Sequence, residues 1–324
     1  MVILIDIVLL TMLVFSTIAI VRLRNLFAII MLSGIYSLIS ALLFVILDAV
    51  DVAFTEAAVG AGISTVLMLA TIGITGYEQK KTPTINAVLP FIVVSITGAV
   101  LVYGTLDMPV FSDPTAPIHQ HVAPRYIQES PNEIGIPNMV TSVLASYRGY
   151  DTMGEVIVVF AALVGVLSLI GIHEPKIAPS YSEEPARPIL QVMTKFMVPF
   201  ILLFALYVQF HGDFGPGGGF QAGVIFSVAI ILYTLTFSQY DGMQLAPPKL
   251  LKTLASAGVL IYGGVGIWTL LKGGKFLDYD VLAKDPITGQ HEGILIIEFG
   301  VGLTVASVMI LMFFAFISRG DQNP

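Results

Sequence analysis

The sequence predicts an all-α integral membrane protein with about nine transmembrane helices, its N-terminus outside and its C-terminus inside the cell. The 324 residues are 56% hydrophobic and only 11% charged, and their mean hydropathy is +0.89, unlike a soluble domain. Runs of about 20 apolar residues, long enough to cross the hydrocarbon core as helices, follow one another along the chain. These runs are continuously apolar, whereas the strands of a membrane barrel would alternate.

The spans are predicted in order from the N-terminus. The first lacks the basic segment and cleavage site of a signal peptide, so we expect it to be retained. With the N-terminus outside, ten of the fifteen Lys and Arg residues lie on the inner side, as the positive-inside rule favours. The predicted spans cover about residues 3–21, 27–47, 53–76, 86–105, 152–172, 194–211, 218–238, 250–271 and 293–317.

Two segments are too polar to span. Residues 106–140 are rich in proline and carry His119 and His121, which predicts an outer loop that could cover neighbouring helices. Residues 173–192 form a proline-punctuated inner linker. We expect the domain boundary there, with a five-helix module at 1–172 and a four-helix module at 193–324.

Composition also excludes several classes of function. The chain has no cysteine, which rules out disulfides, thiolate-bound iron–sulfur clusters and cysteine nucleophiles, so any electron transfer must occur in another chain. The net charge of −7 and the absence of a basic cluster argue against nucleic acid as a partner. We expect no catalytic site, no metal and no cofactor in this chain, and the lipid bilayer as its surroundings.

Four carboxylates fall inside predicted spans, namely Asp6, Glu56, Glu155 and Glu298. An ionisable group at a helix centre costs about 2.5 to 3.5 kcal/mol on insertion scales, so each is a functional candidate. In the predicted orientation all four lie toward the outer ends of their helices. Together they could form an acidic layer that relays protons or holds Na⁺ loosely. The alternative is that these side chains only reach the headgroup region.

The stretch SYRGYDTMGEVIVVF, residues 146–160, starts the fifth span. Asp151 and Thr152 are expected to cap this helix. Glu155 lies four residues after Asp151, so the two carboxylates share a face and could exchange a proton or cation, with Arg148 tuning their affinities. The alternative is a well-capped helix without a transport role.

The stretch FHGDFGPGGGFQAG, residues 210–223, separates the sixth and seventh spans. No lysine follows its glycines, so it is no nucleotide-binding loop. Pro216 is expected to stop the sixth helix, and the glycines to allow positive φ or close backbone approach. His211 and Asp213 would form a titratable pair beside this backbone. The turn could serve helix packing or take a direct part in an ion route.

Three motifs together resemble a known family. GDFGPGGGFQAGV resembles the signature of the B subunit of Mrp-type multisubunit Na⁺/H⁺ antiporters and of its counterpart in membrane-bound hydrogenases. DVAFTEAAVGAGISTVLM (51–68) and RGYDTMGEVIVV (148–159) resemble motifs in the C-terminal part of the A subunit of those antiporters. The resemblance covers about residues 1–172 and 193–318. The fusion of both modules resembles archaeal hydrogenase or sulfur-reductase complexes somewhat more than bacterial antiporters.

The resemblance implies roles for individual residues. Glu56 and Glu155 would belong to the ion-translocating region and Asp151 to its cap. Asp213 stands where many relatives have histidine, which puts a histidine-specific role there in doubt. The B-subunit signature is matched by Pro216, Gly217, Gly218, Gly219 and Phe220.

We therefore expect a non-redox membrane subunit of a cation/proton antiporter-like complex in a prokaryotic plasma membrane. It would help to move Na⁺ or H⁺, coupled to exchange or to a redox reaction in hydrogenase or sulfur-reductase partner subunits. Two alternatives remain open. One is a self-contained secondary transporter for a small solute, and the other is a structural scaffold that holds neighbouring membrane subunits together.

Overall fold

The computed structural model describes residues 2–80, 88–110, 113–172 and 188–320. Within these ranges the chain is helical and contains no β-strand, and nine helices are long and apolar enough to cross a membrane. The predicted fold class and number of spans are thus confirmed for the described part of the chain. Residues 173–187 of the predicted linker lie outside it, and residues 188–192 begin a helix.

Four spans precede the polar segment at 106–140. They are α1 (Val2–Arg22), α2 (Leu26–Ile46), a third span made of α3 (Val50–Thr55), η1 (Glu56–Ile63) and α4 (Ser64–Thr75), and α5 (Val88–Thr105). The remaining spans are α10 (Gly149–Leu169), α11 (Pro188–His211), α12 (Gly219–Thr236), α14 (Pro248–Leu271) and α15 (Pro286–Gly320).

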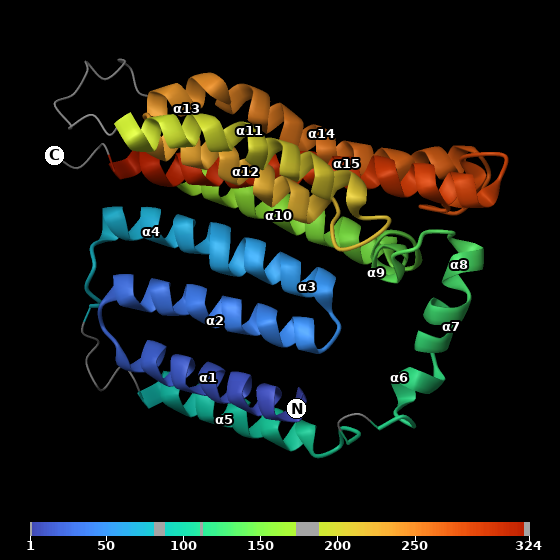
Figure 1. Cartoon of the computed structure of the whole chain (residues 1–324), viewed down its shortest axis with the longest axis horizontal. Helices are drawn as coiled ribbons and strands as arrows, with labels where there is room; N and C mark the ends of the chain where they lie inside the picture. The colour runs from blue at the N-terminus through green and yellow to red at the C-terminus, as the bar shows by residue number, and fades with distance from the viewer. Residues whose placement is uncertain (1, 81–87, 111–112, 173–187, 321–324) are drawn as a thin grey trace.

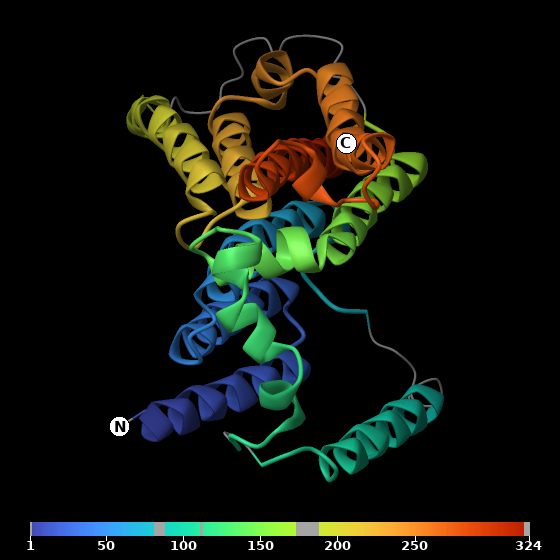
Figure 2. The same cartoon turned by 90° about the vertical axis from the view of Figure 1, so that its right-hand side faces the viewer.

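The helices lie in layers (Figure 1). One layer contains α11, α12, α14 and α15, with α10 along its edge, and α15 packs against α10, α12 and α14. The span α3–η1–α4 lies next to this layer and contacts α15 through α4 and α12 through η1. Beyond it come α2 and then α1. Helix α5 is drawn beside α1 in Figure 1, but Figure 2 shows that it stands apart from the other helices.

The best-packed part of the chain surrounds α15, which is 35 residues long. Its inward side chains, such as Ile294, Val305 and Phe313, are fully buried. In contrast, no residue of α5 is buried. Because lipid is as apolar as these side chains, close packing holds such helices together rather than exclusion from water.

The described chain contains two π-helical segments. One is η1, in the middle of the third span, and the other is η3 (Ser142–Tyr147), immediately before α10. A π-helical turn carries an extra residue, shifts the helical face and leaves some carbonyls without their usual partner. In η3, the carbonyl of Ala145 accepts a hydrogen bond from the Tyr279 hydroxyl at 3.1 Å. Tyr279 begins the short helix η4 (Tyr279–Val281) and is completely buried.

The predicted loop at 106–140 is a chain of short helices. They are α6 (Pro117–Gln120), α7 (Ala123–Gln128), α8 (Ser130–Glu133) and α9 (Met139–Thr141). This connector runs along the ends of the spans from α5 to the start of α10 (Figure 1). A further short helix, α13 (Gln239–Leu245), joins α12 to α14.

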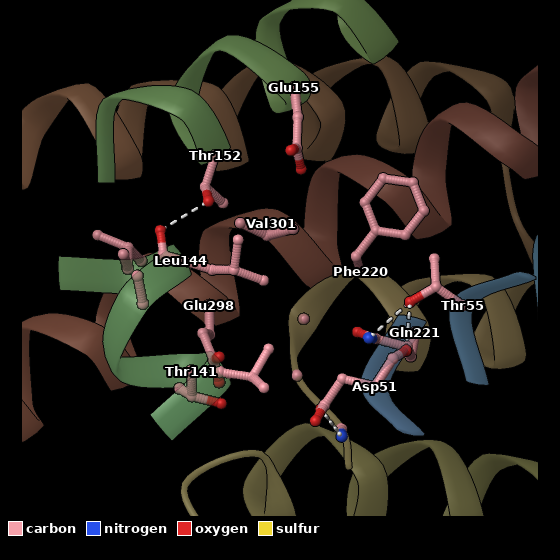
Figure 3. Close-up of a pocket in the computed structure, with 16 residues that line it drawn as sticks. Asp51, Thr55, Thr141, Leu144, Thr152, Glu155, Phe220, Gln221, Glu298 and Val301 are labelled. Atoms are coloured by element: carbon pink, nitrogen blue, oxygen red, sulfur yellow. Dashed lines mark hydrogen bonds between the residues drawn. The ribbon is translucent and has the colours of Figure 1, made fainter. Parts of the chain in front are cut away.

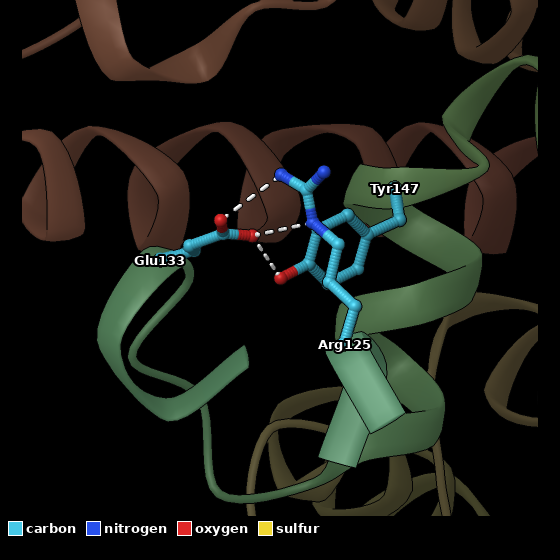
Figure 4. A network of polar contacts seen from close by, with 3 residues as sticks. All are labelled: Arg125, Glu133 and Tyr147. Carbon is cyan, nitrogen blue, oxygen red and sulfur yellow. Dashed lines mark hydrogen bonds and ion pairs between the residues drawn. The ribbon is translucent and has the colours of Figure 1, made fainter. Parts of the chain in front are cut away.

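A polar network fastens the connector to η3 (Figure 4). The carboxylate of Glu133 accepts hydrogen bonds from the guanidinium of Arg125, with an Nη2–Oε1 distance of 3.0 Å, and from the hydroxyl of Tyr147. Burial, together with this bond to Glu133, raises the pKa of Tyr147 to about 12. The phenol therefore stays a hydrogen-bond donor at physiological pH.

Candidate functional site

A cavity of about 170 Å³ lies where α3, η3, α10, α12 and α15 meet. Three carboxylic side chains line it, Asp51 from α3, Glu155 from α10 and Glu298 from α15. They lie on different sides of the cavity (Figure 3). The rest of the wall comes from Gly217 and Gly218 of the glycine-rich turn and from Thr55, Val140, Thr141, Leu144, Ala145, Thr152, Gly219, Phe220, Gln221, Ile297 and Val301.

The glycine-rich turn brings backbone directly against Glu298. Gly218 is the N-cap of α12 and has a φ of 122°, a conformation that favours glycine. A side chain on Gly219 would overlap the backbone carbonyl of Glu298. The turn thus meets both predictions made for its glycines, a positive φ and a close approach. Since the N-terminus of a helix carries a partial positive charge, α12 favours an anion at this place.

The carboxylate of Glu298 lies between the two ends of this turn. A Cβ atom placed on Gly212 would be 3.3 Å from Oε2 of Glu298, and one on Gly218 would be 3.2 Å from Oε1. The carboxylates of Asp213 and Asp51 are close enough to interact electrostatically with that of Glu298. Glu298 is therefore the central acidic group of the site.

Asp51 and Asn138 hold the turn from the other side. The backbone N–H of Gly217 donates to Oδ1 of Asp51 at 3.3 Å. The amide of Asn138 donates to the carbonyls of Gly212 at 3.0 Å and Gly215 at 2.9 Å, and lies 3.5 Å from Oδ1 of Asp51. The end of the connector therefore fixes the turn and supplies part of the cavity wall.

The start of α10 differs from its prediction. Arg148 is the N-cap, and no side chain caps the helix. The carboxylate of Asp151 accepts a hydrogen bond from Nε of Arg148 at 2.6 Å, and Thr152 donates to the carbonyl of Leu144 at 2.7 Å. The predicted caps were wrong because η3 continues to within one residue of α10, so Thr152 bonds to a carbonyl of η3. Asp151 and Arg148 do not line the cavity, whereas Glu155 does.

The other two predicted carboxylates lie elsewhere. Glu56 is the first residue of η1, and its carboxylate lies beside Gly60, next to Ser37 of α2. Asp6 lies on α1, where its Oδ1 atom is buried without a hydrogen-bond partner among the described residues. Of the four carboxylates expected in one acidic layer, the structure brings Glu155 and Glu298 together at the cavity.

The predicted pairing of His211 with Asp213 is also wrong. The ring of His211 stacks on that of Tyr207, with centroids 4.8 Å apart. Asp213 instead pairs with His291 of α15, with an Nδ1–Oδ2 distance of 2.9 Å. Burial raises the pKa of Asp213, and the neighbouring His291 partly offsets that effect. The two residues of the motif point to different neighbours because a turn separates them.

Three polar residues of the site were missed in the sequence. Asp51 lies in a quoted motif but just before the predicted start of its span, and His291 lies just before the last predicted span. Asn138 stands at the end of a long polar segment, where nothing in the sequence distinguishes it. Among the residues that the structure describes, no three or more His, Asp or Glu side chains lie close enough together to be joint ligands of one metal ion.

Comparison with protein families divides the chain into three consecutive matches. Residues 11–76 match MbhD, the D-type subunit of MBH, and residues 91–184 match MbhE, the E-type subunit of MBH. Residues 189–311 match the domain related to the MnhB subunit of Na⁺/H⁺ antiporters. Over 130 residues the chain is 33% identical to the antiporter subunit mnhB2 of Staphylococcus haemolyticus, covering 92% of that protein and 39% of this chain.

The chain belongs to the MnhB family of antiporter subunits. It is a multi-pass membrane subunit of a cation/proton antiporter-like complex, and other membrane subunits are its partners. A longer relative, the probable A/B-type subunit of a K⁺/H⁺ antiporter of Rhizobium meliloti, is 23% identical over 238 residues, which are 65% of this chain and 23% of that protein.

Two solved structures resemble the MnhB-family chain. A chain of the Mrp complex from Dietzia sp. shares its fold with a TM-score of 0.76 and 23% identity, over 95% of this chain and 34% of that one. A chain of the archaeal membrane-bound sulfane sulfur reductase matches with a TM-score of 0.53 and 26% identity, over 72% of this chain and 98% of that one. The MnhB-family chain thus spans about a third of the Mrp chain.

Proposed function

We propose that this subunit passes Na⁺ or H⁺ across part of the membrane through the cavity at Glu298. The observation that carries the proposal is the meeting of Glu298, Asp51 and Glu155 at one cavity, beside the backbone of the glycine-rich turn. Nearby carboxylates repel one another when ionised, and a bound proton or cation relieves the repulsion. A site that accepts either ion in turn is what an exchange of Na⁺ for H⁺ requires.

Each wall of the cavity has its own part in this proposal. Glu298 exchanges the ion, Asp51 holds the turn and adds negative charge, and Glu155 connects the cavity to the start of α10. Asp151 and Arg148 would tune the charge near that start. Glu56 would serve the ion-translocating region from a separate place between η1 and α2. Asp6 would add a further carboxylate on α1.

The same proposal includes the division of the chain. The first module would be residues 1–172 and the second residues 193–324, joined on the inner side at 173–192, with the N-terminus outside. Its support is that the family matches change from MbhE to MnhB near residues 184–189. The cavity would then form between the modules, since α3, η3 and α10 belong to the first and α12 and α15 to the second.

The test is Glu298→Gln in the assembled complex, studied in closed membrane vesicles. Glutamine keeps the size of the side chain but cannot carry an exchangeable proton or charge, so we expect cation/proton exchange to fall by about 10²-fold or more. Glu292→Gln is the matched control, because Glu292 is on the same helix and does not line the cavity. Exchange at the normal rate in Glu298→Gln would refute the proposal.

Assembly must be measured alongside exchange. Copurification of the partner subunits with each variant separates transport from the scaffold alternative. A scaffold role predicts that Glu298→Gln loses partners while the exchange per assembled complex stays unchanged. The identity of the copurifying subunits also tests our proposal that the partners include those of a hydrogenase or a sulfur reductase.

A further inference from the structure

The turn between α11 and α12 carries a carboxylic side chain, Asp213, that lies between the cavity and the protein surface. Asp213 follows Gly212, whose Cα faces the carboxylate of Glu298. The side chain of Asp213 is only 9% exposed, whereas the imidazole of His291, its partner at 2.9 Å, is 49% exposed. A series of polar groups thus leads from the solvent-accessible imidazole of His291 to the buried carboxylate of Asp213 and on toward the cavity. Neither Asp213 nor His291 lines the cavity itself.

The spacing on α15 gives this series its direction. His291 and Glu298 are seven residues apart, close to two full turns, so they lie on the same side of the helix with a rise of about 10 Å between them. Asp213 bonds to the first and interacts electrostatically with the second. The turn therefore holds a carboxyl group between a surface base and the acid of the cavity.

We propose that His291 and Asp213 form a proton port into the cavity, a route that rests on the proposed role of Glu298. The imidazole takes a proton from water through Nε2. The Nδ1–H proton then passes to Oδ2 of Asp213, leaving a neutral carboxylic acid and a neutral imidazole that is protonated on Nε2. Before the next cycle, exchange with solvent water returns the imidazole to the Nδ1–H tautomer. Asp213 passes that proton to the carboxylate of Glu298 and becomes a carboxylate again. No charge is created or lost within the chain beyond the proton that enters.

Asp213 is suited to hold a proton for a short time. Its burial raises its pKa, and a charged His291 imidazole opposes this effect. His211 cannot replace His291, because its ring stacks on Tyr207. The other titratable groups around the turn and the start of α15, among the described residues, are Asp51, His211, Tyr279, Asp280, Lys284, Asp285, Glu292 and Glu298.

The competing explanation is that the pair of Asp213 and His291 only holds the turn against α15. The variant Asp213→Asn distinguishes the two explanations. Its amide oxygen can still accept the hydrogen bond from Nδ1–H of His291, but the side chain can no longer carry a proton. A structural clip predicts normal exchange in Asp213→Asn. A proton port predicts a fall of about 10²-fold, the low end of the contribution of a positioned proton carrier.

The experiment measures cation/proton exchange as a function of pH in two preparations of vesicles, one for each orientation of the assembled complex. We expect His291→Gln to slow exchange about tenfold when proton supply at the His291 side is limiting, because water then reaches Asp213 directly but less efficiently. The pH profile of exchange should shift for that side only. Glu292→Gln, which alters the neighbouring exposed residue, should keep the normal profile.

Chemical rescue supplies the decisive readout. In His291→Ala, added imidazole should restore exchange, and it should have no effect on Glu298→Gln. Normal rate and pH profile in both His291→Gln and Asp213→Asn, while Glu298→Gln is inactive, would overturn the port and leave the proposed function intact. Active Glu298→Gln would instead overturn the proposed function. Loss of partner subunits in Asp213→Asn with normal exchange per complex would also overturn the port.

Discussion

Helices α15 and α5 are both apolar enough to span a membrane, yet they relate to the rest of the chain in opposite ways. In the most apolar stretch of α15, 67% of the residues are buried inside the chain, and in that of α5 none are. Helix α15 therefore finds its packing partners within this subunit. The sides of α5 are left to lipid or to other membrane subunits.

This difference in packing indicates which helices can form the walls of a defined binding site. An ion-binding cavity needs walls that keep their spacing to within a fraction of an ångström. The helices around α15 meet that need, since they touch through backbone at glycines such as Gly219 and Gly223. Helix α5 has no such contact in the described chain, and no residue of the cavity comes from it.

The largest expected effect comes from adding one methyl group at the closest contact. Gly219→Ala would overlap the backbone of Glu298, which neither helix can avoid without moving. We expect a loss of about 3 kcal/mol or more in the free energy of unfolding, visible in the yield and the thermal unfolding of the purified complex. Gly98→Ala in α5 is the control, because a Cβ atom there meets nothing within 4 Å. Equal losses of stability in the two variants would contradict the difference in packing between α15 and α5.

A smaller effect is expected from one buried hydroxyl. Tyr279→Phe removes the donor to the Ala145 carbonyl in η3, and a buried carbonyl without a partner costs about 1–3 kcal/mol. Thermal unfolding of the complex measures this loss. Tyr103→Phe in α5 changes a side chain that is 76% exposed, so it should leave the unfolding temperature unchanged. A stable Tyr279→Phe variant would mean that η3 satisfies its own carbonyls.

The smallest effect concerns the connector and depends on pH. The hydrogen bond from Tyr147, followed by that from Arg125, holds the pKa of Glu133 below its ordinary value of 4.5. The network is therefore fully present above pH 4.5, and it weakens as the pH falls through the lowered pKa. The protection of the backbone amides of residues 117–133, which is their hydrogen exchange corrected for its intrinsic dependence on pH, should fall in that acidic range. In Glu133→Gln this fall should be absent, because the protection is already lower at neutral pH.

The sequence predicted the spans because long apolar runs leave few alternatives in a membrane. It predicted less of the site, since the face on which a side chain lies depends on details that apolarity does not record. Asp51 and Glu56 are five residues apart, so they point to different sides of the third span, and only Asp51 reaches the cavity. Nothing in the local sequence indicates which of the two would face α12.

Long-range pairs were the other source of error. Asp213 and His291 are separated by two spans, so only the packing of α12 against α15 brings them together. The π-helical segment η3 likewise displaced the expected caps of α10, because the end of η3 is held by contacts with Tyr279 and Gln290 of the C-terminal half. The glycine-rich turn was predictable, since its conformational demands are local.

The length of α15 has a geometric consequence. Its 35 residues make a rod of about 52 Å, whereas the hydrocarbon layer is about 30 Å thick. A tilt of about 55° would be needed to submerge it, well beyond the tilts that membrane helices adopt. At least one end of α15 therefore lies outside the hydrocarbon layer, in the headgroup region or in the water beyond it.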